Sequence, residues 1–177
     1  MLDTEDKQAW CRVGEELEDV FAASRLPQFG LTGGINDDKL YDKYTHDLNI
    51  MFPSDLKSVR TPLFKAQDLY GIDPQYAVTF NVKDATRYTK LYPNIVVVFD
   101  VDWQTTSMVI GSTSYEVLPM HRTWAGFLKD IASAIKASGC RQISYARRTE
   151  DAAGNAKSSW VFDVRNLHEM KELDRVE

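Results

Sequence analysis

The stretch NIVVVFDVDW, residues 94–103, constrains the fold of this 177-residue chain more than any other. Its apolar centre, IVVVF, consists of β-branched and aromatic residues, which favour strands. This run has the length of a buried strand and falls far short of the roughly 18 residues that a membrane helix needs. We therefore expect a central strand that is covered on both faces, and no membrane partner.

The patterns around this strand predict alternating helices and strands. Apolar residues recur at helical spacing over 5–25 and 123–138, which predicts two amphipathic helices. In the second helix, Thr123 would cap the start, and Trp124 and Phe127 would lie on the apolar face. Further helices are expected at 63–70, 83–93 and 166–173, and strands at 46–52, 55–61, 76–82, 107–118 (as a hairpin), 143–148 and 158–164.

This order favours one α/β or α+β domain over residues 1–177, with a central mixed β-sheet flanked by helices. The net charge of −5 does not indicate a basic nucleic-acid-binding protein, although carboxylates at a metal site would also lower the charge. The acidic start MLDTEDKQAW differs from a signal peptide, and Cys11 and Cys140 lack metal or redox spacing. We therefore expect a cytoplasmic protein with reduced thiols.

Two carboxylates and a lysine lie close together in the segment THDLNIMFPSDLK, residues 45–57. Asp55 and Lys57 share one face of a strand, because side chains alternate along it. Asp47 opens the preceding strand, and the short step to Asp55 requires a tight hairpin that places the two carboxylates close together. A divalent cation would relieve their repulsion and bind phosphate oxygens, while Lys57 would orient or deprotonate water, or stabilise charge on the phosphate.

A helix that carries a glutamate, followed by Asp and then Asp-x-Lys on adjacent strands, resembles the PD-(D/E)xK nuclease superfamily. The matching residues are Asp47 and the DLK of residues 55–57, with His46 at the position where the motif has proline. The core of this restriction-endonuclease-like fold is a helix, three strands, a helix and a further strand. The expected elements fit that order over residues 5–103, which leaves 104–177 as an elaboration.

The resemblance implies a nuclease that hydrolyses phosphodiester bonds with Mg²⁺ or Mn²⁺, and it favours DNA over RNA as the substrate. By this resemblance, Asp47 and Asp55 hold the metal and Lys57 acts on the attacking water. Cleavage of both strands of a duplex would need two such sites, which a homodimer would supply.

The resemblance also implies a helix acid, for which GEELED offers Glu15, Glu16 and Glu18. At about 100° per residue, Glu15 lies opposite the apolar face, and Glu16 and Glu18 lie on its two flanks. Many members of the superfamily have Gly-x-x-x-Glu in this helix, a pattern that Gly14 and Glu18 match. The resemblance therefore favours Glu18, with Glu15 as the alternative.

Basic residues near the expected site are candidates for contacts with nucleic-acid phosphates. These residues are Arg60, Lys65, Arg87, Arg147 and Arg148. The first two follow the strand that carries Lys57, and Arg87 lies on the next helix. The last two precede the polar loop TEDAAGNAK.

Three alternatives stay open on the sequence alone. The first is a non-catalytic module on the same fold that binds nucleic acid or protein, and the second is an acidic interaction protein that works through its net charge. The third is a rival metal pair formed by Asp100 and Asp102, which share a face of the central strand. Stabilisation by Mg²⁺ or Mn²⁺ would separate an enzyme from the two non-catalytic classes.

Overall fold

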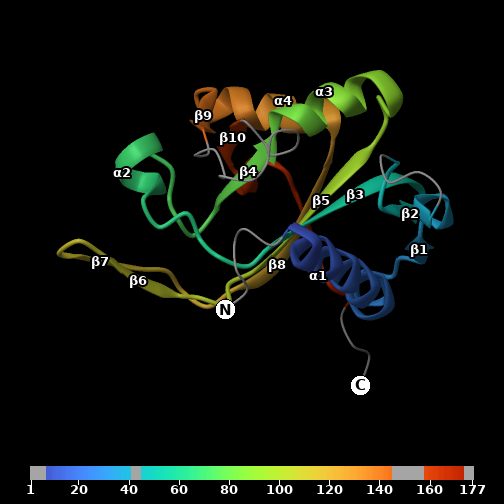
Figure 1. The fold of residues 1–177 in the computed structure, drawn as a ribbon, viewed down its shortest axis with the longest axis horizontal. Helices are drawn as coiled ribbons and strands as arrows, with labels where there is room; N and C mark the ends of the chain where they lie inside the picture. Colours follow the sequence, from blue (N-terminus) through green and yellow to red (C-terminus); the bar gives the residue numbers. More distant parts are fainter. Residues whose placement is uncertain (1–6, 41–44, 145–157, 174–177) are drawn as a thin grey trace.

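The computed structural model describes residues 7–40, 45–144 and 158–173 of the chain, which form a mixed α and β fold (Figure 1). A six-stranded sheet with the order β1-β2-β3-β5-β8-β11 forms its centre. These strands are β1 (Gly33–Ile35), β2 (Leu48–Ile50), β3 (Phe52–Val59), β5 (Val96–Asp102), β8 (His121–Phe127) and β11 (His168–Met170). β5 lies inside this sheet, parallel to β3 and antiparallel to β8, so the expected central strand is confirmed.

Two smaller sheets accompany the main one, where the sequence indicated a single sheet. An antiparallel sheet contains, in order, β4 (Ala77–Asn81), β10 (Ser158–Asp163) and β9 (Arg141–Ser144). The expected hairpin is formed by β6 (Ser107–Ile110) and β7 (Thr113–Glu116), with Gly111 in its turn at a φ of 63°. Figure 1 shows this hairpin extending away from the main sheet.

The helices of the described residues flank these sheets. They are α1 (Lys7–Val20), the π-helical turn η1 (Phe21–Arg25), the 3-10 turns η2 (Leu26–Phe29), η3 (Asp37–Leu40) and η4 (Val164–Asn166), α2 (Ala66–Tyr70), α3 (Val82–Leu91) and α4 (Leu128–Ala137). Gly71 ends α2 at a φ of 70°, as expected for a left-handed cap. No helix in the described ranges is long and apolar enough to cross a membrane.

The main sheet is covered on both faces, because side chains alternate along its strands. On one face, Val97 and Phe99 of β5 belong to the larger core cluster, which includes side chains of α3, α4, β4 and β10. On the other face, Val98 of β5 and Leu56 of β3 pack with Phe21 of η1. We call these the α3 face and the α1 face of the sheet (Figure 1).

The helix predicted over 123–138 is wrong in its first turn. Thr123, Trp124 and Phe127 lie in β8, and α4 starts at Leu128. The segment HRTWAGF pairs with β5 along its whole length, and Trp124 is 2% exposed in the core. This pairing and burial outweigh the helical spacing, because aromatic and β-branched residues suit a buried sheet.

The C-terminal helix predicted at 166–173 is wrong as well. After η4 the chain forms β11, because pairing with the edge of β8 satisfies its backbone groups. At the end of the first helix, Val20 is 57% exposed although it is apolar, whereas Phe21 is 2% exposed. The helix widens into the π-helical turn at Phe21, which changes the direction of the side chains there.

The hairpin between β2 and β3 is tighter than the sequence indicated. Only Met51 separates the two strands, with a φ of 46°, and β3 starts at Phe52. Asp55 therefore lies inside β3 rather than at the start of a strand. Leu48 pairs with Ser54, which sets the register of the hairpin.

A substitution of Phe99 tests how much the core on the α3 face contributes to stability. Its side chain is fully buried and forms edge-to-face contacts with Phe80 and Phe162, with ring centroids 6.4 and 5.5 Å apart. Phe99→Ala should lower the free energy of unfolding by about 3–5 kcal/mol, because it removes buried apolar surface and leaves a cavity. Leu91→Ala, at a 58% exposed position, should change it by less than about 0.5 kcal/mol. Urea unfolding measures both values, and similar losses in the two variants would contradict the core assignment.

Candidate functional site

The β2–β3 hairpin brings Asp47 into contact with Asp55. Asp47 immediately precedes β2, and its backbone N–H donates to Ser54 O at 3.0 Å. Its Oδ2 accepts a hydrogen bond from Leu56 N at 3.3 Å, and its carboxyl group is hydrogen-bonded to that of Asp55. The predicted placement of the two carboxyl groups is confirmed, whereas their role as metal ligands stays a prediction.

Lys57 points to the same face of β3 as Asp55 and links it to a second carboxylate. The Lys57 Nζ atom lies 2.8 Å from Asp55 Oδ2 and 2.9 Å from Asp84 Oδ2. Asp84 lies in the first turn of α3, whose start is fixed by the Asn81 side chain that accepts from Lys83 N at 2.8 Å. The Lys57 side chain is 25% exposed and that of Asp55 only 3%, so the lysine connects a buried carboxyl group with the surface.

The pKa of Asp55 is raised to about 8. Burial of the carboxyl group is the largest cause, the Lys57 ammonium opposes it, and the hydrogen bond and negative charge of Asp47 add to the rise. A hydrogen bond between two carboxyl groups needs one of them to donate. The pair therefore shares one proton at neutral pH.

Lys57 keeps its charge in this environment. Burial acts to lower the pKa of its ammonium, but the negative charges of Asp55 and Asp84 contribute to raising it well above the ordinary value. An ammonium with a raised pKa suits the donation of hydrogen bonds and the stabilisation of negative charge. It does not suit general base catalysis, which needs a pKa near the working pH.

Arg87 of α3 forms an ion pair with Asp84 and a hydrogen bond with Tyr88. Arg87 Nη2 lies 3.5 Å from Asp84 Oδ1 and donates to the Tyr88 hydroxyl oxygen at 2.7 Å. Tyr88 is fully buried, and burial raises the pKa of its hydroxyl group, which stays protonated. Arg87 was predicted to contact phosphates, and the structure places it in this network with 24% of its side chain exposed.

Glu18 is not gathered with the two aspartates into a ligand set. It is buried on α1 at 9% exposure, whereas Glu15 is exposed. The helix continues into η1, which packs on the α1 face through Phe21 and Leu56, opposite the face to which Asp55 points. Across residues 7–40, 45–144 and 158–173, no group of three or more His, Cys, Asp or Glu side chains is placed to hold a metal ion.

Asp47 and Asp55 nonetheless fit a magnesium ion. Mg²⁺ binds through one or two carboxylates and keeps several of its waters, so a pair of carboxyl groups is sufficient. Asp55 Oδ2 is buried, and the Lys57 Nζ atom lies 2.8 Å from it as an ion pair. A bound cation would take the place of the shared proton and remove the repulsion between the carboxylates.

The other predicted basic residues lie farther along the chain. Arg60 follows β3 and Lys65 precedes α2, and both are exposed. Their positions after β3 agree with the prediction, and their role in phosphate binding stays untested. Arg147 and Arg148 lie outside the described residues.

Asp100 and Asp102 do not share a ligand site in the way that Asp47 and Asp55 do. Asp100 accepts a hydrogen bond from Thr123 Oγ1 at 2.8 Å and lies 3.8 Å from Arg25 Nε. Asp102 accepts from Gln104 Nε2. Because each carboxylate has its own partner, the structure disfavours the rival metal pair.

The sequence alone did not identify Asp84 as a residue of this site. Its one local signal was its position in the first turn of a helix, where acidic residues are common because they interact favourably with the helix dipole. That pattern does not distinguish a surface residue from the partner of a lysine on a neighbouring strand. The contact with Lys57 depends on how α3 packs against β3.

The raised pKa of Asp55 predicts that stability depends on pH. Between its ordinary value of 3.8 and about 8, the folded protein binds a proton that the unfolded chain releases. The free energy of unfolding should therefore fall as pH rises through this window, by on the order of 1 kcal/mol per pH unit. Asp55→Asn, which is neutral and similar in shape, should remove this fall.

Urea unfolding at several pH values between about 5 and 8, in buffer with a chelator, measures this difference. Asp19→Asn removes an exposed carboxylate from α1 and should follow the wild type. If the wild type gained stability relative to Asp55→Asn as the pH rose, the shared proton would be disproved.

Comparisons of the chain with protein-family models, with curated proteins and with solved structures find no match. A functional assignment therefore rests on the site itself. Its central features are the carboxyl pair of Asp47 and Asp55 and the ammonium of Lys57 between Asp55 and Asp84.

Proposed function

We propose that this protein is a divalent-metal-dependent nuclease that hydrolyses phosphodiester bonds of nucleic acid, with DNA preferred over RNA. The observation that carries the proposal is the contact of the Asp47 and Asp55 carboxyl groups across a one-residue turn, with the Lys57 ammonium 2.8 Å from Asp55. Buried charged groups cost free energy unless they are paired. A divalent cation would pair with the two carboxyl groups of this cluster, and a phosphate would pair with its ammonium.

The order of the elements supports the resemblance to PD-(D/E)xK nucleases. α1, β1, β2, β3, α3 and β5 follow one another as helix, three strands, helix and strand, with η1, η2, η3, α2 and β4 as additions. The three strands are antiparallel neighbours, and β5 returns parallel to β3. Asp47, directly before β2, and the DLK of β3 therefore lie on the two arms of one hairpin, which agrees with the order of the motif.

In this proposal, Asp47 and Asp55 hold the cation. When bound, Mg²⁺ or Mn²⁺ would supply positive charge to the oxygens of the scissile phosphate. The burial of Asp55 limits screening by water, which strengthens electrostatic interactions at this position. Glu18 is not included as a ligand, because the described residues contain no group of three such side chains placed to hold a metal ion.

Lys57 serves as a hydrogen-bond donor. Its charged ammonium orients the attacking water or stabilises the negative charge that builds on the phosphate. Asp84 is a positioning residue, because its Oδ2 lies 2.9 Å from Nζ and would keep the ammonium in place when a cation engages Asp55. Arg87 and Tyr88 position Asp84 in turn.

The substrate would approach along Lys57 and Asp84, the partly exposed members of the cluster, between β3 and α3. Arg60 and Lys65 are exposed farther along the chain and would contact phosphates beside the scissile one. A homodimer would provide two sites for the two strands of a duplex.

Cleavage of labelled single- and double-stranded DNA and RNA in Mg²⁺ or Mn²⁺ tests the proposal. Lys57→Met keeps most of the aliphatic side chain and removes the charge, and it should lower kcat by at least about 100-fold. Asp55→Asn should have an effect of similar size. Lys83→Met removes an exposed ammonium from α3 and should cleave at the wild-type rate. Cleavage by the Lys57 and Asp55 variants at that same rate would reject the site.

Metal binding should also be visible without turnover. At a free Mg²⁺ or Mn²⁺ concentration of about 100 times Kd, the wild type should gain about 3 kcal/mol in the free energy of unfolding. Asp55→Asn should lose most of this gain. A folded wild type that binds DNA but neither cleaves it nor responds to either cation would favour the non-catalytic binding module.

A further inference from the structure

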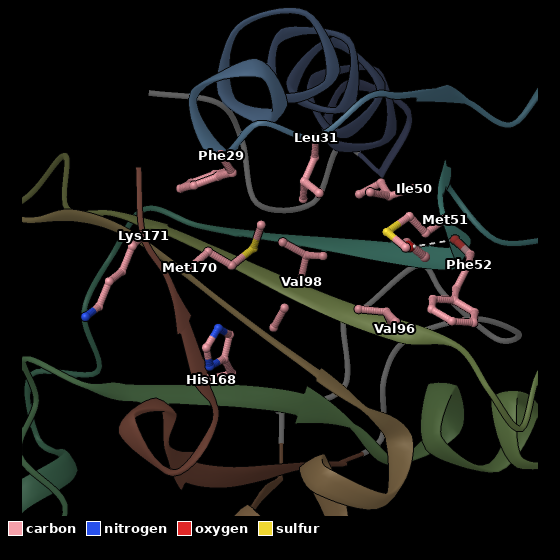
Figure 2. A pocket seen from close by; sticks show the side chains of 12 residues that line it. Phe29, Leu31, Ile50, Met51, Phe52, Val96, Val98, His168, Met170 and Lys171 are labelled. Atoms are coloured by element: carbon pink, nitrogen blue, oxygen red, sulfur yellow. Dashed lines mark hydrogen bonds between the residues drawn. The ribbon is translucent and has the colours of Figure 1, made fainter. Parts of the chain in front are cut away.

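A cavity of about 340 Å³ lies on the α1 face of the main sheet, opposite the face that holds the carboxyl cluster. It opens between η2 and the strands of the sheet (Figure 2). Its apolar lining includes Phe29, Ile50, Val96, Val98 and Met170. Cavities that bind small molecules are of about 300–1,000 Å³ and are mostly apolar, with a few polar groups. This cavity therefore has the size and lining of a ligand site.

The two ends of the cavity differ in polarity. His168 and Lys171 lie at one end, and both are exposed. At the other end, next to the β2–β3 turn, Met51 is 84% exposed and Phe52 is 44% exposed. Figure 2 shows these pairs of residues on opposite sides of Val98, with the Lys171 side chain reaching outward. The cavity is thus a groove with a polar end and an apolar end.

The polar end carries a positive charge that no residue among 7–40, 45–144 and 158–173 pairs with. A second cavity of about 240 Å³ adjoins this end and shares Lys171 with the first. Of its other basic residues, Arg25 pairs with Glu172 at 2.6 Å and Arg122 pairs with Glu169 at 3.3 Å. Lys171 has no ion pair with any described residue. Lys171 is therefore the cation that a bound anion would neutralise.

The groove crosses the main sheet from β2 to β11. These are five neighbouring strands, and strands lie about 4.8 Å apart, which gives a length of about 19 Å. An apolar path of this length across the sheet suits an extended alkyl chain better than a compact ring system.

We infer that this groove binds a linear amphipathic carboxylate of the long-chain fatty acid class. The carboxylate would lie at Lys171, and the alkyl chain would run over Val96 and Val98 toward Met51. This site is separate from the carboxyl cluster, so the inference does not depend on the proposed nuclease activity.

Isothermal titration calorimetry with sodium decanoate and sodium tetradecanoate, below their aggregation concentrations, tests the inference. Affinity should rise by up to about fourfold for each added methylene, since burial of one CH₂ contributes about 0.8 kcal/mol. Lys171→Met should weaken decanoate binding about tenfold, the effect of one charge-assisted hydrogen bond. The same variant should bind decanol as the wild type does. Lys136→Met, at an exposed position on α4, should leave both affinities unchanged.

Ala125 lines the cavity, so Ala125→Leu should block both ligands. Its melting curve shows whether this variant is folded, and the surface variant Lys171→Met provides the test if it is not. The inference is rejected if neither fatty acid binds, or if Lys171→Met binds decanoate as tightly as the wild type does. It is also rejected if ultracentrifugation shows a second copy of the chain that covers the groove and excludes tetradecanoate. Nucleic-acid cleavage by Lys171→Met should equal that of the wild type, which separates this test from the test of the nuclease.

Discussion

The parallel pairing of β3 with β5 is the constraint on which both sites depend. β3 is hydrogen-bonded on one edge to β2 and on the other to β5, so its side chains must enter one of two covered faces. Leu56 enters the α1 face, and Asp55 and Lys57 enter the α3 face. A carboxyl group in that position has little contact with water. Its charge must therefore be compensated by neighbouring residues or by a ligand, and this requirement organises Asp47, Lys57 and Asp84 around it.

The sequence was sufficient for features that local geometry decides. Alternation along a strand predicted that Asp55 and Lys57 share a face, and the short step from Asp47 predicted the tight hairpin. It was insufficient where distant segments decide the outcome. Trp124 shows helical spacing with its neighbours, yet pairing with β5 makes its segment a strand. Asp84 meets Lys57 only because α3 packs against β3, and no short-range pattern encodes that contact.

The carboxyl pair of the cluster has an unusual protonation state, whereas the lysine has its usual one. The lysine is firmly charged, whereas the carboxyl pair retains a proton at neutral pH. If the proposed cation binds here, it would compete with this proton for the same oxygens, because a carboxylate must lose its proton to become a metal ligand. Under the proposed function, metal affinity would therefore depend on pH, and the burial that raises the pKa of Asp55 would add to the free energy that the cation must supply.

The one-residue turn at Met51 has a consequence for both faces of the sheet. A methionine at a φ of 46° is strained by on the order of 1 kcal/mol, and a glycine would adopt this conformation without that strain. The side chain that causes the strain lines the groove on the α1 face, while the turn sets the register that joins Asp47 to Asp55 on the α3 face. Met51 thus contributes its side chain to one face and its backbone conformation to the other, so a substitution at this position would act on both sites at once.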